Sequence, residues 1–313
     1  MGRSCPARET SARPSPYSLP GAPASGRLAA MDRQITTAIN YEAEYNNRAR
    51  VPEHMEIMAG WSADASKWRK DAAEARLDVA YGESVRQCVD IFKPRKEKPG
   101  PIALFIHGGY WQALGRESFS HMARGANMHG VTVAVPSYDL CPQVTVVDII
   151  NQLRACCLFL WKTYRRKIVV SGHSAGGHLT AALLATQWHK IDEDVPPLLV
   201  TGGLAISGLY DLRPLVRTSI NENLKLTSDS AEGASPVFWS APVGLKLIAA
   251  VGSEESDEYK HQVADITHEW HAGGSAVIPL TIDGANHFTV IEGLADPDDL
   301  LTHTLVGLAS AAG

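Results

Sequence analysis

The order of hydrophobic and polar positions along the chain predicts strands that alternate with helices. Within residues 75–92, the segments ARLDVAYG and RQCVDIF alternate in the way that two strands joined by a tight turn would. The runs at 101–107 and 131–138 are continuously apolar, which is typical of strands buried on both faces. Further strands are expected at 167–173, 197–207, 244–252 and 276–284.

Between these strands, apolar residues recur at helical spacing. Helices are expected at 144–164, 175–188, 258–270 and 297–311. Strands that alternate with helices require crossover connections, so the pattern predicts an α/β protein with a mostly parallel central sheet flanked by helices. Residues 208–243 contain too many Pro, Ser and Asn for one long element, and we expect a short lid or loop cluster there.

Residues 1–30 differ in composition from the rest of the chain. They are rich in Ser, Pro, Gly, Ala and Arg and lack apolar periodicity, which predicts a disordered N-terminal extension. They contain no apolar core of a secretory signal. Their Arg- and Ser-rich, acid-poor composition weakly resembles that of an organellar transit peptide, and a wrongly assigned start upstream of Met31 is at least as good an explanation. Residues 31–313 are expected to form a single domain.

Composition narrows the functional classes. The 313 residues are 45% hydrophobic, enough for a sizeable core, and the formal net charge of −5 argues against nucleic acid or an anionic membrane as a partner. No run approaches the roughly 18 apolar residues of a membrane span. Five cysteines without CxxC spacing favour a reducing, cytoplasmic location. No HExxH or comparable spacing occurs, so neither a metal nor another cofactor is expected.

The pentapeptide GHSAG, between a predicted strand and a predicted helix, indicates nucleophilic catalysis. A serine on a sharp strand-to-helix turn projects its hydroxyl from the backbone, and Gly172 and Gly176 leave room for Ser174. The following helix directs its N-terminus at the reaction centre. Acyl transfer also needs donors for an oxyanion, and the backbone N–H of Ala175 is one of them.

The segment HGGYW, directly after the strand at 101–107, supplies the rest of the expected oxyanion loop. Gly108 and Gly109 allow N–H groups to turn toward one point without a Cβ in the way. Tyr110 and Trp111 are expected to wall the acyl side of a substrate pocket. The ring of His107 is expected to brace the loop rather than to take part in catalysis.

A general base and an acid should follow the nucleophile along the chain. His287 lies just after the last predicted strand, where a loop histidine can reach the strand ends, whereas His173 and His178 are expected to be structural. The segment GSEESDE contains four carboxylates at positions 254, 255, 257 and 258. Spacing alone does not select one of them.

Five segments together resemble the kynurenine formamidase (arylformamidase) branch of the α/β-hydrolase superfamily. They are HGGYW, GHSAGGHL, SGLYDLRPL, VGSEESDEYKHQ and NHF. The resemblance extends from about Tyr41 to the C-terminus and implies an α/β-hydrolase fold. In that family the acid stands three residues after the glycine that ends its strand, which is Glu255 here. The resemblance also places the nucleophile at Ser174 and the base at His287.

Family members hydrolyse the formamide of N-formyl-L-kynurenine, many also cleave small aryl esters, and they are often dimers. The resemblance therefore implies a cofactor-independent serine hydrolase that takes a small acyl group, formyl, from an aryl amide. A short-chain carboxylesterase would share every catalytic residue and is the alternative. A third hypothesis, a hydrolase fold that serves as a ligand receptor, is disfavoured because no member of the triad is missing.

Overall fold

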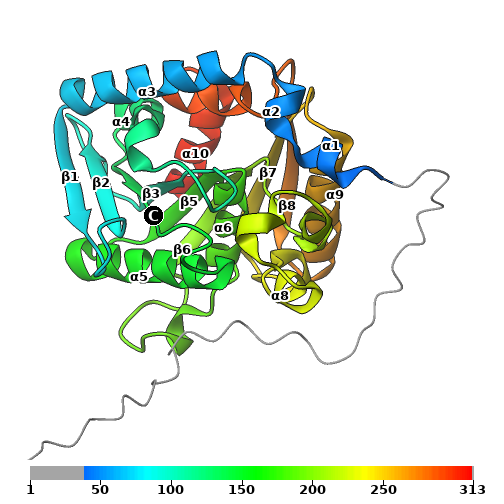
Figure 1. The fold of residues 1–313 in the computed structure, drawn as a ribbon. Helices are drawn as coiled ribbons and strands as arrows, with labels where there is room; N and C mark the ends of the chain where they lie inside the picture. The colour runs from blue at the N-terminus through cyan, green and yellow to red at the C-terminus, as the bar shows by residue number, and fades with distance from the viewer. Residues whose placement is uncertain (1–38, 312–313) are drawn as a thin grey trace, which may run out of the picture.

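The computed structural model describes residues 39–311, and these form one eight-stranded sheet covered by helices on both faces (Figure 1). The extension predicted at residues 1–30 lies outside the described residues. The strand order is β1-β2-β4-β3-β5-β6-β7-β8. Strand β2 runs antiparallel to β1 and β4, and every other pair is parallel. The predicted mostly parallel α/β sheet is therefore confirmed.

The strands lie close to the predicted ranges. They are β1 (Glu74–Ala80), β2 (Cys88–Lys93), β3 (Ile102–Ile106), β4 (Val133–Pro136), β5 (Ile168–His173), β6 (Val200–Ile206), β7 (Lys246–Gly252) and β8 (Ala276–Ile282). Strands β3, β4 and β5 are buried along their whole length, because both faces of the sheet are covered. Burial on both sides explains why these strands read as continuous apolar runs.

The longer helices form two layers. They are α3 (His54–Asp71), α5 (Val146–Tyr164), α6 (Ala175–Leu184), α9 (Asp257–Ala272) and α10 (Leu300–Ala311). Side chains of α5, α6 and α9 pack against one face of the sheet, where Leu104 points. Side chains of α3 and α10, together with the short helix α4 (Arg124–Met128), pack against the other face, where Phe105 points. No helix among residues 39–311 is long and apolar enough to cross a bilayer.

Two parts of the fold frame the carboxyl ends of the strands. The short helices α1 (Tyr41–Tyr45) and α2 (Asn47–Arg50) precede α3. The region predicted as a lid or loop cluster contains α7 (Asn221–Leu224), α8 (Ser228–Gly233) and short 3-10 turns. Helix α1 contacts both α9 and the 3-10 turn Arg213–Arg217 of this region. The N-terminal helices and the lid therefore meet over the same end of the sheet.

Candidate active site

Ser174 occupies the sharp turn between β5 and α6. Its backbone adopts φ 57° and ψ −116°, a conformation that L residues rarely adopt and that costs on the order of 1–3 kcal/mol. The two flanking glycines make the turn possible. A Cβ on Gly172 would lie 2.3 Å from the carbonyl oxygen of Gly176, and a Cβ on Gly176 would lie 2.0 Å from that of Ile106. Ser174 is therefore held where β3, β5 and α6 meet.

His287 and Glu255 form a buried pair beside this turn. The two Glu255 oxygens accept three hydrogen bonds: from His287 Nδ1 at 2.6 Å, from Ser207 Oγ at 2.5 Å and from the Gly252 backbone N–H at 2.9 Å. A carboxylate can only accept, so the proton lies on Nδ1 and leaves Nε2 of His287 as an acceptor. Of the four acids that spacing left open, the structure places Glu255 against the histidine.

The His287 ring is held from two further sides. His173 Nε2 contacts the main-chain carbonyl of His287 at 2.8 Å, and the two imidazole rings are 4.7 Å apart. Burial lowers the pKa of His173 well below its ordinary value, so this ring is a neutral donor to that carbonyl. The Tyr259 ring lies 4.6 Å from the His287 ring. The expectation that His173 is structural agrees with these contacts.

The glycines of the expected oxyanion loop lie next to the nucleophile. A Cβ on Gly108 would approach the Ser174 Cβ to 3.1 Å, and one on Gly109 would lie 2.3 Å from the carbonyl oxygen of Ala113. Gly109 also has φ 109°, which disfavours any side chain. Ala175 is the first residue of α6, so its N–H is one of the unpaired donors at a helix N-terminus.

His107 lies beneath this loop. Its ring stacks on Tyr138, with centroids 4.3 Å apart, and on Phe119, at 5.9 Å. Its Nδ1 contacts the carbonyl oxygen of Gly108 at 2.7 Å. Burial lowers the pKa of His107 to about 4, so the ring is neutral at ordinary pH. These contacts are consistent with the expected role of His107 in bracing the loop.

The two aromatic residues of HGGYW have different positions. Tyr110 lines the cavity above Ser174 and is half-buried. Trp111 was expected to wall the same pocket, and this expectation is wrong. The left-handed backbone at both residues turns the Trp111 side chain into the core, where it is fully buried and packs edge-on against His178 at 5.0 Å.

A cavity of about 420 Å³ opens above Ser174 and His287. Its aromatic and aliphatic lining is Tyr45, Met58, Trp61, Tyr110, Leu114, Phe119, Ile220 and Phe288. Its polar side chains outside the catalytic pair include Glu42, Asn46, Asn47, Arg48, Gln112 and Ser219. The cavity has the size of a small-molecule site, and its lining is both apolar and polar.

Three residues at this cavity were not recognised from the sequence: Tyr45 and Asn47, which line it, and Tyr259, which bonds to Asn47. Asn47 Nδ2 donates to the hydroxyls of Tyr259 at 2.9 Å and Tyr110 at 3.3 Å, and these hydroxyls lie 2.7 Å apart. The Tyr110 hydroxyl donates to the Tyr45 carbonyl at 2.6 Å, so the proton shared by the two phenols comes from Tyr259. We call Tyr45, Asn47, Tyr110 and Tyr259 the tyrosine–asparagine network. Its members are far apart in sequence, so no local sequence motif predicts these contacts.

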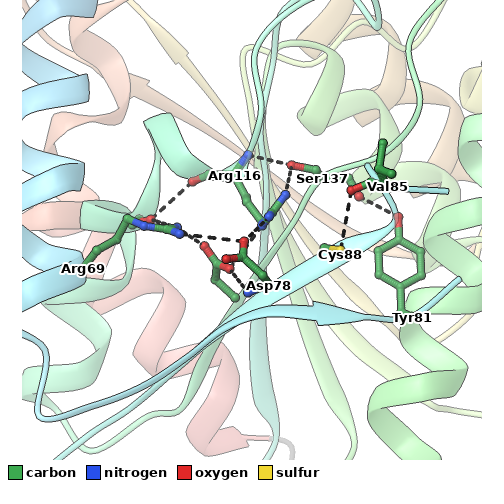
Figure 2. Close-up of polar contacts among 9 residues, drawn as sticks. Arg69, Asp78, Tyr81, Val85, Cys88, Arg116 and Ser137 are labelled. Atoms are coloured by element: carbon green, nitrogen blue, oxygen red, sulfur yellow. Dashed lines mark hydrogen bonds and ion pairs between the residues drawn. The ribbon is translucent and has the colours of Figure 1, made fainter.

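An ion cluster anchors the far end of the oxyanion loop (Figure 2). It consists of Arg69 on α3, Asp78 on β1, Asp90 on β2 and Arg116 just after the loop. Both arginines bond to both carboxylates. The Arg116 backbone N–H also donates to Ser137 Oγ at 2.9 Å. These bonds tie the loop to the antiparallel end of the sheet.

Within residues 39–311, no group of three or more His, Cys, Asp or Glu side chains lies close enough together to hold a metal ion.

Comparisons with known proteins agree with the fold and with the sequence motifs. A family model described as BD-FAE matches residues 89–215. A kynurenine formamidase of Salmo salar is 31% identical over 243 residues, which are 75% of this chain and 82% of that protein. A kynurenine formamidase of Danio rerio is 29% identical over 245 residues, covering 76% and 83%.

Solved structures give the same fold. The structure of a candidate thioesterase from Silicibacter sp. TM1040 superposes with a TM-score of 0.74 at 34% identity, covering 86% of this chain and 99% of that one. An esterase from Pyrobaculum calidifontis superposes with a TM-score of 0.63 at 16% identity, covering 84% and 94%. The α/β-hydrolase fold expected from the motifs is therefore confirmed.

Proposed function

Because the chain belongs to the kynurenine formamidase family, we propose that it is a serine hydrolase that removes a formyl group from an aryl amide such as N-formyl-L-kynurenine. Family membership makes the chain a hydrolase, and the serine mechanism is our inference. The observation that carries it is the contact of Glu255 with His287 Nδ1, which leaves Nε2 of His287 as an acceptor, while Ser174 and His287 line the same cavity.

Acylation would begin with attack of Ser174 Oγ on the formyl carbon. His287 Nε2 takes the hydroxyl proton, and Glu255 stabilises the resulting imidazolium. The carbonyl oxygen becomes an oxyanion that accepts from the backbone N–H groups of Gly109 and Ala175, with Gly108 shaping the site. His287 then protonates the departing nitrogen, the C–N bond breaks, and the aryl amine leaves a formyl ester on Ser174.

Deacylation would repeat these steps with water as the nucleophile. His287 takes a proton from water as its oxygen attacks the formyl carbon, and it returns that proton to Ser174 Oγ as the ester bond breaks. Formate is released and the serine is regenerated. No step in this scheme requires a cofactor.

Tyr110 supports the preference for a small acyl group. Its hydroxyl is held by the Tyr45 carbonyl, by Tyr259 and by Asn47, so its ring cannot swing out of the cavity without losing these three hydrogen bonds. A long acyl chain would meet this fixed ring beside the oxyanion loop. We expect p-nitrophenyl acetate to be cleaved better than p-nitrophenyl octanoate, and the reverse order would contradict this reasoning.

We also propose that residues 31–313 form one catalytic domain, that the protein is cytoplasmic and that it forms a homodimer. The described residues share one sheet, which supports a single domain. Four cysteines, at positions 88, 141, 156 and 157, are free thiols, which is typical of a reducing compartment.

The test compares turnover of N-formyl-L-kynurenine with that of p-nitrophenyl acetate, using the chain from Met31 and the Ser174→Ala variant. A formamide kcat/KM well above the ester value, lost in the variant, is the expected result. Ester turnover with little formamide turnover would instead assign a short-chain carboxylesterase that uses the same residues. Activity that survives in Ser174→Ala would overturn the serine mechanism.

A further inference from the structure

Tyr259, on the first turn of α9, contacts both Ser174 and His287. Its side chain is fully buried, and the centroids of the Tyr259 and His287 rings are 4.6 Å apart. Its hydroxyl forms a hydrogen bond with the Ser174 side chain. Neither acylation nor deacylation, as proposed, uses this hydroxyl, although it lies at the nucleophile.

The tyrosine–asparagine network fixes the direction of the hydrogen bonds at the Tyr259 hydroxyl. The Tyr110 hydroxyl donates its proton to the Tyr45 carbonyl at 2.6 Å, so it accepts from Tyr259 at 2.7 Å. Asn47 Nδ2 donates to the Tyr259 oxygen at 2.9 Å. A phenolic oxygen carries one proton and two lone pairs, so Tyr259 keeps one lone pair for a donor at Ser174.

The Tyr259 hydroxyl therefore faces the nucleophile as an acceptor. Burial raises the pKa of Tyr259, so the hydroxyl stays protonated at ordinary pH and its proton stays in the bond to Tyr110. Before attack, the donor at the remaining lone pair is the Ser174 hydroxyl. In the proposed acylation His287 takes the Ser174 proton, and the Tyr259 lone pair then loses its donor.

The departing nitrogen of an amide must lie close to this lone pair. It is bonded to the carbon that Ser174 Oγ attacks, and it must be within hydrogen-bond reach of His287 Nε2 to receive a proton. The Tyr259 hydroxyl is bonded to Ser174 and its ring packs on His287, so its oxygen lies beside the same point. A secondary amide has an N–H there, whereas an ester has an oxygen without hydrogen.

We propose that the Tyr259 hydroxyl accepts a hydrogen bond from the N–H of the scissile amide and so makes the site selective for amides over esters. A buried N–H without an acceptor keeps the full cost of its desolvation. The bond also holds the N–H in one direction, so the nitrogen lone pair that forms as the carbon becomes tetrahedral is free to face His287 Nε2.

This inference rests on the proposed function and adds a specificity-determining residue to it. No covalent bond to Tyr259 forms or breaks. The proton still passes from Ser174 through His287 to the departing nitrogen, and Tyr259 only accepts a hydrogen bond.

The test compares Tyr259→Phe with the native protein on formanilide and on phenyl formate. These substrates share the formyl group and the phenyl ring and differ only at the scissile N–H or oxygen. We expect kcat/KM for formanilide to fall roughly 10- to 100-fold, and kcat/KM for phenyl formate, corrected for spontaneous hydrolysis, to change less than about 2-fold.

The matched control is Tyr164→Phe, which makes the same chemical change away from the site. Tyr164 ends α5 near the start of β5, whereas Ser174 follows the end of that strand. The Tyr164 hydroxyl accepts from Arg76 Nη1 at 3.3 Å. Tyr164→Phe should match the native protein on both substrates.

N-methylformanilide gives a second measurement, from the substrate side, that needs no stable variant. It lacks the amide N–H, and the native protein should cleave it roughly 10-fold or more slowly than formanilide. The two anilides should differ less in Tyr259→Phe. Equal rates on the two anilides in the native protein would contradict the inference.

The outcomes separate this inference from the proposed function. If formanilide is cleaved but Tyr259→Phe lowers turnover of both substrates equally, or of neither, the role of Tyr259 in selectivity is wrong and the formamidase proposal stands. If the native protein favours phenyl formate, yet Tyr259→Phe still lowers the amide-to-ester ratio by roughly 10-fold or more, Tyr259 has this role and the formamidase proposal fails. If neither formanilide nor N-formyl-L-kynurenine is cleaved, both proposals fail.

Discussion

The ion cluster offers a comparison of two carboxylates that share the same two arginines. Asp90 is fully buried, and it also accepts from the backbone N–H of Asp78 at 2.8 Å. The side chain of Asp78 is 61% exposed. We therefore predict that Asp90→Asn and Asp78→Asn, which make the same chemical change, differ widely in their cost to the free energy of unfolding.

The magnitude follows from what each change leaves behind. The side chains of Arg69 and Arg116 are only 20% and 14% exposed. Without the Asp90 charge, these two arginines share one carboxylate, that of the exposed Asp78. Removing one partner of a buried ion pair costs about 3–5 kcal/mol. Asn retains one acceptor oxygen, which favours the lower end of that range. An exposed pair contributes about 0.2–1 kcal/mol, and this is the expected cost of Asp78→Asn.

Urea unfolding followed by circular dichroism measures both costs, and thermal unfolding gives a second readout. For a protein of this size, 3 kcal/mol lowers Tm by roughly 5 °C, whereas Asp78→Asn should lower it by no more than about 2 °C. Equal destabilisation by the two variants would refute the reasoning, because burial would then not decide the cost. So would a loss below about 1 kcal/mol for Asp90→Asn.

Three further predictions concern the acid, the buried histidines and helix α3. Ser207→Ala removes one hydrogen-bond donor to the Glu255 carboxylate, which is then less firmly placed against His287. We expect kcat to fall roughly 10-fold with KM unchanged. A change confined to KM would contradict this prediction. Burial lowers the pKa of His107 and His178 to about 4, below the 6.5 of an unfolded chain, so the unfolded state takes up protons first as pH falls below 6.5. Stability is therefore full above pH 6.5 and decreases as pH falls toward 4, by about 1 kcal/mol for each ring between pH 7 and 5.5; an unchanged Tm over that interval would count against it. Gly60→Ala adds a Cβ that meets nothing within 4 Å in the middle of α3, and the urea midpoint should rise by the equivalent of about 0.5–1 kcal/mol; a lower midpoint would be inconsistent with an open site.

The sheet and the turn at Ser174 could be predicted because their causes are local. Strands buried on two faces must be apolar throughout, as residues 102–106 and 168–170 are. Helix α3 was not predicted, because among its residues only Trp61 and Ala65 are buried and the remainder face solvent or the edge of the core. A narrow apolar stripe of this kind gives a weak periodic signal.

The rest of the site depends on contacts that sequence spacing does not encode. The backbone at Tyr110 and Trp111 adopts positive φ values of 49° and 57°, and the Trp111 ring lies in the core rather than in the cavity. The choice among the acids depends on which carboxylate faces His287, and the strand end and Ser207 together place Glu255 there. Asn47 and Tyr259 are 212 positions apart, so only the folded chain brings them together.

That separation has a consequence for how the protein becomes active during folding. The wall of the cavity is closed by bonds that join α1 and α2 to α9, across 212 to 217 residues of chain. Contacts of such long range form only after the entropy of closing the intervening chain has been overcome, so we expect them to form late in folding. Substrate binding therefore requires that α1 and α2 have docked on α9. A nascent chain that has not yet completed α9 can contain the turn at Ser174, but its cavity is not yet closed.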